Sequence, residues 1–204
     1  MAPSDAASAR GISEVLHYTS EKGIYGALVK DAVLSRKRLE ADPEIEFIFQ
    51  AVWPVKAPAW KDHISLSLTR INLDLFERSR SHYPEYWWGV VSFETAILDH
   101  DGVHFTTTNN IYPTCERGQG EDGFESMFKP SVLGRYRYEW RRDGLTDDQT
   151  TDRTAEVLYP GALSLAHLNR IYVPTPDERR LIRAWCDALG KEEPPVDVRP
   201  DVFT

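Results

Sequence analysis

Residues 63–70, His-Ile-Ser-Leu-Ser-Leu-Thr-Arg, alternate strictly between polar and apolar side chains. Successive side chains of an extended strand point to opposite faces, so this pattern predicts a half-buried β-strand with Ile64, Leu66 and Leu68 inward. The other face would carry a row of small polar side chains that ends at Arg70. An arginine at a strand end is suited to bind a phosphate through two hydrogen bonds, although surface arginines are also common there.

Further segments carry strand or helix signals. Apolar runs predict strands at residues 15–18, 87–93, 103–106 and 170–173. Capping residues predict helices that begin after Thr19 or Ser20, at Asn72, and at Thr175, the last of which ends at Gly190. Residues 36–60 are expected to form a loop or lid with a short ordered piece at 45–52. Residues 107–151 are polar and irregular, and their aromatic side chains favour a functional loop over disorder.

The length of 204 residues fits one domain with a buried core. We expect residues 1–11 to be a flexible lead-in, residues 12–190 to be the domain, and residues 191–204 to be a tail. No apolar run approaches the roughly 20 residues that span a bilayer, and no signal peptide is apparent, so a cytoplasmic protein without a membrane partner is expected. The two cysteines, Cys115 and Cys186, lie far apart in the sequence, which favours reduced thiols.

The net charge of −8 counts against a protein that coats nucleic acid through bulk electrostatics. Positive charge is nevertheless concentrated between Lys129 and Arg142. Guanidinium and aromatic groups alternate there, as Arg135, Tyr136, Arg137, Tyr138, Trp140, Arg141 and Arg142. This mixture suits phosphates and stacked bases of a single strand. An amphipathic helix with a solvated basic side is an equally good reading.

Residues 154–161, Thr-Ala-Glu-Val-Leu-Tyr-Pro-Gly, form a strand-like segment with one carboxylate. Charged residues are depleted in strands, and a buried one needs a partner or a purpose. Glu156 is therefore the strongest candidate for a catalytic group. The alternative is an edge strand on which Glu156 simply faces water.

Several other chemistries find little support. No GxGxxG follows a predicted strand, which argues against a Rossmann-type cofactor site. His100 and His104 are separated by an Asp-Gly turn and have no cysteine or carboxylate cluster near them, so no metal site is expected. Cys115 lacks the His-Asp arrangement that would activate a nucleophilic thiol.

Taken in order, four segments resemble the DarT toxin family, whose members transfer ADP-ribose from NAD to bases of single-stranded DNA. The segment 17–19, His-Tyr-Thr, resembles the family's opening H-x-T, and Leu68-Thr69-Arg70 stands where its F-x-P-R stands. Residues 105–110, Phe-Thr-Thr-Thr-Asn-Asn, resemble its F-T-D-G-N-A segment, and residues 153–158, Arg-Thr-Ala-Glu-Val-Leu, resemble its R-x-Q-A-E-F-L strand. The resemblance covers roughly residues 15–189. The chain departs from the family at Thr69 for Pro, at Thr107-Thr108 for Asp-Gly, and at Thr154 for Gln.

The resemblance implies an α+β fold, an ADP-ribosyltransferase-like split β-sandwich with flanking helices and a cleft between its sheets. It also implies that NAD is the co-substrate, that Glu156 and Arg70 are catalytic, and that His17, Tyr18, Thr19 and Arg70 bind NAD without a metal. The single-stranded DNA would contact Thr106, Asn109, Asn110, Arg135, Arg137, Tyr138, Arg141 and Arg153. A toxin of this kind implies a macrodomain-type antitoxin that removes ADP-ribose.

The chemistry of the transfer agrees with these residues. Breaking the bond between nicotinamide and ribose develops an oxocarbenium-like centre, which a carboxylate can stabilise while it also accepts a proton from the nucleophile. Two alternatives stay open: an ADP-ribosyltransferase that acts on protein or RNA, and an inert NAD- or nucleotide-binding module. The acidic net charge leaves a protein acceptor open, whereas the presence of Glu156 argues against an inert module.

Overall fold

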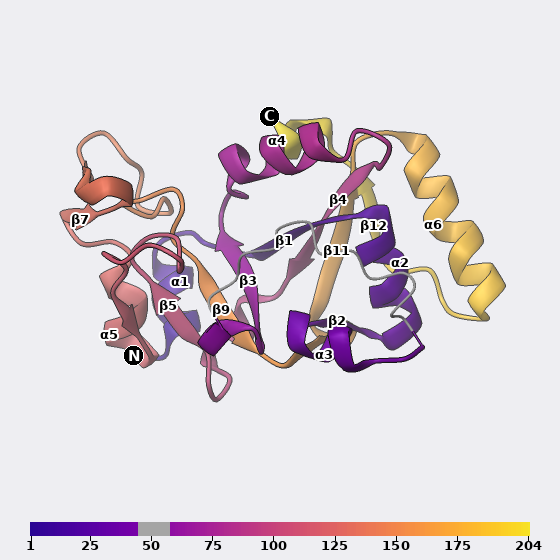
Figure 1. Ribbon diagram of the computed structural model, residues 1–204, viewed down its shortest axis with the longest axis horizontal. Coiled ribbons are helices and arrows are strands. Elements are labelled where there is room, and N and C mark those ends of the chain that lie inside the picture. Colours follow the sequence, from indigo (N-terminus) through magenta and orange to yellow (C-terminus); the bar gives the residue numbers. More distant parts are fainter. Residues whose placement is uncertain (45–57) are drawn as a thin grey trace.

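The computed structural model describes residues 1–44 and 58–204, and it is an α+β fold built on one large sheet (Figure 1). The sheet runs in the order β12 (Val196–Val198), β11 (Leu168–Val173), β4 (Trp88–Phe93), β1 (Val15–Ser20), β3 (His63–Leu68), β9 (Val157–Pro160), β5 (His104–Thr106) and β6 (Arg117–Gly118). Two short ribbons pair β10 (Ala162–Ser164) with β2 (Ala32–Leu34), and β7 (Ser131–Leu133) with β8 (Glu139–Arg141).

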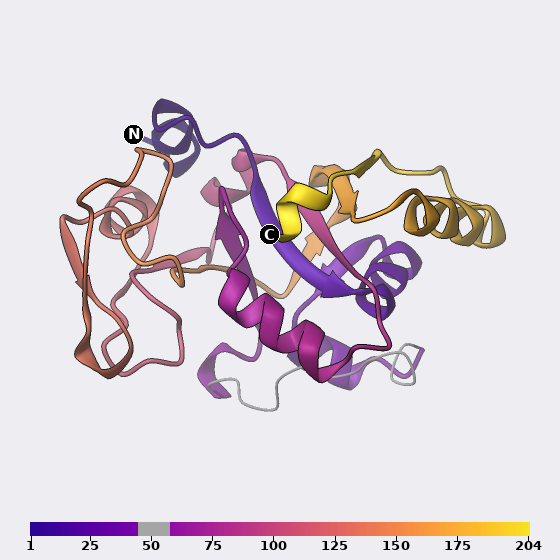
Figure 2. The same ribbon diagram turned by 90° about the horizontal axis from the view of Figure 1, so that it is seen from above.

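Six α-helices and five 3₁₀ turns flank the sheet within the described residues. The α-helices are α1 (Pro3–Ala9), α2 (Glu21–Lys30), α3 (Arg36–Ala41), α4 (Leu73–His82), α5 (Gly120–Ser126) and α6 (Pro176–Leu189). The 3₁₀ turns are η1 (Pro58–Trp60), η2 (Thr95–Asp99), η3 (Arg135–Arg137), η4 (Leu165–His167) and η5 (Pro200–Phe203). Figure 2 shows α6 at one end of the molecule and the segment that carries α5 and the β7–β8 ribbon at the other.

The sheet splits between β1 and β3. β1 pairs with β4 along its whole length, but it pairs with β3 only through Val15↔Leu68 and Leu16↔Ser67. Past Leu16 the two strands share no further ladder pair, and β3 continues its pairing on the other side with β9. The strands β12-β11-β4-β1 thus form one part of the sheet and β3-β9-β5-β6 the other. The predicted α+β class and its split sheet are confirmed.

The predicted alternation along β3 is confirmed. Ile64, Leu66 and Leu68 are buried, whereas Ser65 and Ser67 are only half-buried and face a cavity. β4 is buried at all six of its positions, as its apolar sequence predicts for a strand inside the sheet. Three hydrophobic clusters fill the space between this sheet and the helices.

Capping chemistry explains where the helices begin and end. The Thr175 side chain accepts a hydrogen bond from the N–H of Asp177 at the start of α6, and Gly190 ends this helix in the left-handed conformation. The Asn72 side chain accepts from the N–H of Leu75 at the start of α4. Ser20 is the residue before α2, so β1 runs directly into a helix N-terminus as predicted.

Both ends of the chain are more ordered than the sequence suggests. Residues 3–9, expected as part of a flexible lead-in, form α1, whose Ala6 and Ala7 are buried against the main core. In the expected tail, β12 adds a parallel strand to β11, and Phe203 packs against Phe76 of α4. Small and proline-rich sequences hide such packing because a few buried side chains are enough to anchor them.

The irregular region 107–151 contains α5 and the β7–β8 ribbon. Phe124 and Met127 are fully buried in the main core and attach this region to the sheet. The expected loop or lid at 36–60 includes a helix, α3, while its expected ordered piece at 45–52 lies outside the described residues. Cys115 and Cys186 are both free thiols, as expected. No helix among the described residues is long and apolar enough to cross a membrane.

Candidate active site

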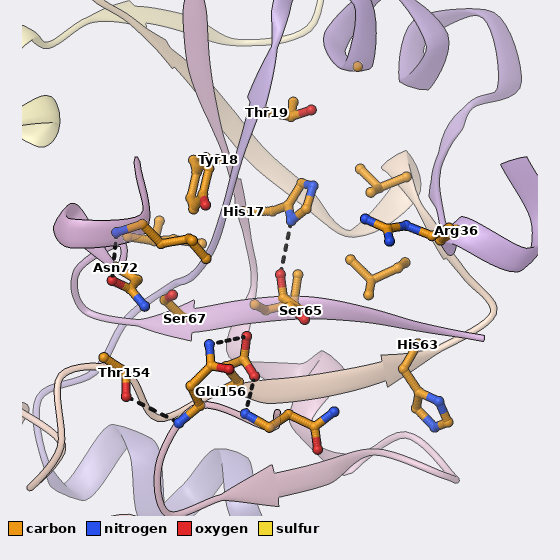
Figure 3. Close-up of a pocket in the computed structure, with 18 of the residues that line it drawn as sticks. His17, Tyr18, Thr19, Arg36, His63, Ser65, Ser67, Asn72, Thr154 and Glu156 are labelled. Carbon is orange, nitrogen blue, oxygen red and sulfur yellow. Dashed lines mark hydrogen bonds between the residues drawn. The ribbon is translucent and has the colours of Figure 1, made fainter. Parts of the chain in front are cut away.

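A cavity of about 620 Å³ occupies the split between β1 and β3 (Figure 3). Cavities of this size fall in the range of about 300–1,000 Å³ that is usual for small-molecule sites. Its walls come from β1, the start of α2, β2, α3, β3, α4, the loop at residues 109–112, and the segment that leads into β9. The divergence of two neighbouring strands therefore creates the space, and side chains from distant parts of the chain line it.

His17 stands where the pairing of β1 with β3 stops. Its Nδ1 lies 3.0 Å from the carbonyl oxygen of Ser65, and the hydrogen bond bridges the two walls of the split (Figure 3). A carbonyl can only accept, so Nδ1 carries the proton in this hydrogen bond. The ring is thus fixed in orientation at the edge of the cavity.

Thr19 follows on the same face of β1 and also lines the cavity. A Cβ atom placed on Gly23 would lie 1.9 Å from the Thr19 Oγ1, so only glycine allows α2 to pack this closely against the strand. The hydroxyl and the helix N-terminus are thereby brought to one wall, where they can bind polar groups of a ligand.

Tyr18 lines the cavity but also belongs to a packed aromatic group. Its ring lies 5.6 Å from the ring of Phe76 and 6.2 Å from that of Trp88. Burial raises the pKa of the Tyr18 hydroxyl, so this group stays protonated at neutral pH. Tyr18 therefore offers an aromatic wall rather than a base.

Glu156 faces the cavity from the segment just before β9 (Figure 3). The backbone N–H of Asn110 donates to its Oε2 at 2.7 Å, and the Asn109 side-chain amide lies 3.5 Å from its Oε1. The Asn109 amide is itself oriented by the N–H of Ile111, which donates to Asn109 Oδ1 at 3.1 Å. The carboxylate is thus held in place by a loop, and Asn109 and Asn110, which were predicted to contact the DNA, both line the cavity.

Thr106 is not a cavity residue, contrary to its predicted role in DNA binding. Its side chain is fully buried, accepts a hydrogen bond from the N–H of Glu156 at 2.8 Å, and donates to the Thr108 carbonyl at 2.7 Å. Thr106 N–H also donates to the Glu156 carbonyl at 2.9 Å. Thr106 thus hydrogen-bonds both the N–H and the carbonyl of Glu156, and its buried side chain is not accessible to a substrate.

Arg70 does not line the cavity either, although it was expected there beside His17 and Glu156. The chain makes a tight turn after β3: Thr69 takes a left-handed φ of 60°, and the Arg70 N–H donates to the Leu68 carbonyl. This turn leaves Arg70 exposed. Sequence position at a strand end could not reveal the direction of the turn that follows.

Arg36 brings a guanidinium to the cavity (Figure 3). It is the first residue of α3, and Ser35 precedes it as the N-cap. Burial lowers the pKa of this guanidinium, and Glu40 opposes the shift, so the group remains charged at neutral pH. Within residues 1–44 and 58–204, the Arg36 side chain makes no hydrogen bond. A half-buried cation without such a partner is suited to receive an anionic ligand.

The other end of the cavity is basic and aromatic. Arg135 and Arg153 line it, and Arg153 pairs with Asp74 at 2.7 Å while its guanidinium lies 5.7 Å from the Trp140 ring. Burial raises the pKa of the Tyr112 hydroxyl, and the positive charge of the nearby Arg135 opposes this shift. This end therefore combines positive charge with ring faces next to Glu156.

The β7–β8 ribbon extends this basic and aromatic end into solvent. Tyr136 is 86% exposed and Tyr138 is 62% exposed. Tyr136 and Arg137 at its tip both have a left-handed backbone, with φ of 56° and 63°. Arg137, Tyr138 and Arg141 lie outside the cavity lining, and Arg141 pairs with Glu139 at 2.8 Å.

Arg142 has a structural role. Its guanidinium donates to the carbonyls of Gln149, Thr146 and Asp147, with the first contact at 2.5 Å, so it closes the turn that follows β8. The basic stretch therefore contains one arginine that supports the loop, one that lines the cavity and two that face outward.

Some cavity residues were not among the predicted site residues, namely Arg36, Asn72, Arg78, Tyr112 and Trp140. Arg36 and Arg78 belong to basic clusters of the sequence, and Trp140 to its basic and aromatic stretch, but nothing there separates a lining residue from a solvated one. No group of three or more metal-ligating side chains occurs in the part of the chain that the structure describes.

Comparisons with known proteins show the family and the fold of the chain. A family model described as DarT, ssDNA thymidine ADP-ribosyltransferase, matches residues 52–204. The fold is similar to Thermus sp. 2.9 DarT in complex with NAD+, with a TM-score of 0.66 and 13% identity over 94% of this chain and 97% of that one.

The same Thermus protein in complex with ADP-ribosylated ssDNA gives a TM-score of 0.65 and 12% identity over 95% of this chain and 97% of that one. Thermosipho africanus DarTG in complex with ADP-ribose gives 0.58 and 15% identity, over 93% of this chain and 50% of that longer one. No curated protein sequence matches the chain.

Proposed function

The chain belongs to the DarT family of single-stranded-DNA thymidine ADP-ribosyltransferases, and we propose that the cavity between β1 and β3 is its active site. The protein is an NAD-dependent ADP-ribosyltransferase that modifies single-stranded DNA. Family membership thus decides in favour of the DNA acceptor over a protein or RNA acceptor. The family's description names thymidine, and we propose thymidine as the modified base.

The arrangement of Glu156 and His17 carries this proposal. Both line the same cavity, Glu156 from the β9 side of the split and His17 from β1, and each is fixed by a hydrogen bond to backbone. NAD bound between them has its nicotinamide ribose next to a carboxylate and next to polar groups of β1. Thr19 and the N-terminus of α2 supply further hydrogen bonds to that end of NAD.

Glu156 is the catalytic carboxylate. The bond between ribose C1′ and nicotinamide breaks, and its electron pair leaves with nicotinamide. The positive charge that develops on the ribose is stabilised by the Glu156 carboxylate. A new bond forms between C1′ and the ring nitrogen of thymidine that bears a proton, and Glu156 accepts this proton.

The acceptor strand lies on the basic and aromatic end of the cavity. Arg135 and Arg153 are placed there to contact phosphates, with Asn109 and Asn110 next to Glu156. The exposed side chains of Arg137, Tyr138 and Arg141 continue this surface along the β7–β8 ribbon. Single-stranded nucleic acids are bound in this manner by a positive groove with stacking platforms.

Arg36 binds the pyrophosphate of NAD, in the role first expected of Arg70. Charge-assisted hydrogen bonds contribute about 1.5–3 kcal/mol, so Arg36→Ala should weaken NAD binding by about 10- to 150-fold in titration calorimetry. Lys37→Ala is the matched control, because Lys37 is the next residue of the same helix and pairs with Asp62 in solvent. Equal NAD affinity of wild type and Arg36→Ala would remove Arg36 from the site, and a large loss in Arg70→Ala would return the role to Arg70.

The proposed function is tested by two measurements on the purified protein. Nicotinamide release from NAD reports bond cleavage, and transfer of labelled ADP-ribose to single-stranded oligonucleotides reports the acceptor. Labelling is expected for oligonucleotides that contain thymidine and not for matched ones in which every thymidine is replaced. Labelling that is indifferent to thymidine would overturn the base assignment alone.

We also propose a biological setting. The resemblance of the sequence to a toxin family supports a role as the toxin of a toxin-antitoxin pair in the cytoplasm, with a macrodomain-type hydrolase that removes ADP-ribose as its partner. Co-expression of such a hydrolase should reverse DNA labelling and any growth arrest that the protein causes.

A further inference from the structure

Two departures of the sequence from the family motifs meet at a single buried carboxylate. Thr108 stands in the segment where the family has Asp-Gly, and Thr154 stands where it has Gln. In the fold both hydroxyls contact Asp152, whose side chain is only 1% exposed. Residues 44 positions apart in the sequence are thus joined beside the catalytic loop.

Asp152 is held by hydrogen bonds and not by an ion pair. Its Oδ1 accepts from the N–H and the hydroxyl of Thr154, each at 2.8 Å, and its Oδ2 accepts from the Thr108 hydroxyl. No salt bridge to Asp152 occurs among the described residues. Burying a carboxylate costs free energy unless its oxygens accept hydrogen bonds, so the buried Asp152 depends on its hydrogen bonds to Thr108 and Thr154.

The hydrogen bonds continue from Asp152 to Glu156. The Thr154 hydroxyl, which donates to Asp152, accepts from the N–H of Asn109 at 3.1 Å. The next N–H along the chain, that of Asn110, donates to the Glu156 carboxylate at 2.7 Å. The loop that holds Glu156 is therefore fixed on one side by Thr108 and on the other by Thr154, and Asp152 connects the two.

We propose that Asp152 is a positioning residue, which acts through Thr108 and Thr154 to hold the loop whose backbone N–H orients the Glu156 carboxylate for ADP-ribose transfer. This inference rests on the proposed function of Glu156. It predicts that loss of the Asp152 contacts slows the chemical step and leaves NAD binding intact. Asp152 borders the cavity, but it is only 1% exposed and its carboxylate oxygens already accept from Thr108 and Thr154, so we expect no direct contact with the dinucleotide.

The experiment is a double-mutant cycle of Asp152→Asn and Thr154→Val, read as kcat for nicotinamide release at saturating NAD. A displacement of a catalytic group by about 1 Å can lower the rate by about 10²-fold, and we expect each variant to lower kcat by about 10- to 100-fold. The double variant should be little worse than either single variant, because both break the same connection. The Kd for NAD should stay within about twofold of wild type, since ground-state contacts are kept.

Two further variants separate positioning from a loss of folding. Thr154→Ser keeps the hydroxyl and should retain near-normal kcat, while Asp143→Asn, an exposed aspartate nine residues earlier, is the matched control. Unchanged kcat in Asp152→Asn and Thr154→Val would overturn the inference, as would a Thr154→Ser variant as slow as Thr154→Val. Parallel losses of kcat, NAD binding and thermal stability would also overturn it, since they indicate general disruption. Failure of wild type to release nicotinamide at all would overturn the proposed function itself.

Discussion

Glu156→Gln should lower ADP-ribose transfer to single-stranded DNA by about 10²–10³-fold, the effect of deleting one preorganised electrostatic group. The amide keeps the shape of the side chain, and its oxygen can still accept from the Asn110 N–H. Only the negative charge and the capacity to take a proton are lost. NAD affinity should survive, because an interaction made chiefly in the transition state contributes to turnover and little to ground-state binding.

Transfer is measured with labelled NAD and a thymidine-containing oligonucleotide, and NAD affinity by calorimetry. Glu85→Gln, an exposed carboxylate away from the cavity lining, serves as the control for the substitution itself. A folded Glu156→Gln protein that labels DNA at nearly the normal rate would show that Glu156 only supports its segment, and the proposed active site would have to be abandoned.

Replacing Tyr136 and Tyr138 by alanine together should weaken binding of single-stranded DNA by about 30- to 10⁴-fold. Stacking of a base on an aromatic side chain is worth about 1–3 kcal/mol, and the two rings project from one ribbon. Both ends of this range count two stacked bases, and a single stacked base would give about 5- to 150-fold. NAD affinity should not change, because neither ring lines the cavity.

The salt dependence of binding provides an independent reading of the same surface. Arg137→Ala should reduce the slope of log K against log salt by about 0.7, the share of one phosphate contact on a single strand. Arg142 is left intact in this series because it holds the turn after β8. Arg180→Ala on α6 is the matched control, since α6 lies at the opposite end of the molecule (Figure 1). Loss of NAD binding with DNA binding preserved would refute the assignment of this ribbon to the acceptor.

Much of the fold was predictable from the sequence because periodicity and capping act locally. The alternation in β3, the apolar run in β4, and the Thr175 and Gly190 caps of α6 each depend on a few neighbouring residues. The order of α1 was not predictable in this way, because its small alanines are buried in the main core and its Ser4 hydrogen-bonds Asp99, 95 residues away in the sequence.

The site was predictable in part. His17 and Glu156 line the cavity as expected: His17 shares one face of β1 with Thr19, and Glu156 lies directly before β9. Arg70 and Thr106 do not line the cavity. The position of Arg70 depends on the left-handed turn at Thr69, and that of Thr106 depends on which face of the three-residue strand β5 is buried. Arg36 belongs to the basic run at residues 36–38. Only the tertiary structure shows that Arg36 is the residue of this run that lines the cavity.

The left-handed backbone at Tyr136 and Arg137 sets the stability of the fold against the DNA-modifying activity. A non-glycine residue costs about 1–2 kcal/mol in this conformation, so glycine at either position would make the folded ribbon more stable. Those two side chains are among the ones proposed to contact the acceptor strand. Selection in the laboratory for thermal stability alone should therefore favour glycine at residues 136 and 137 and lower the rate of DNA modification. Selection for both stability and DNA modification should leave the two positions unchanged.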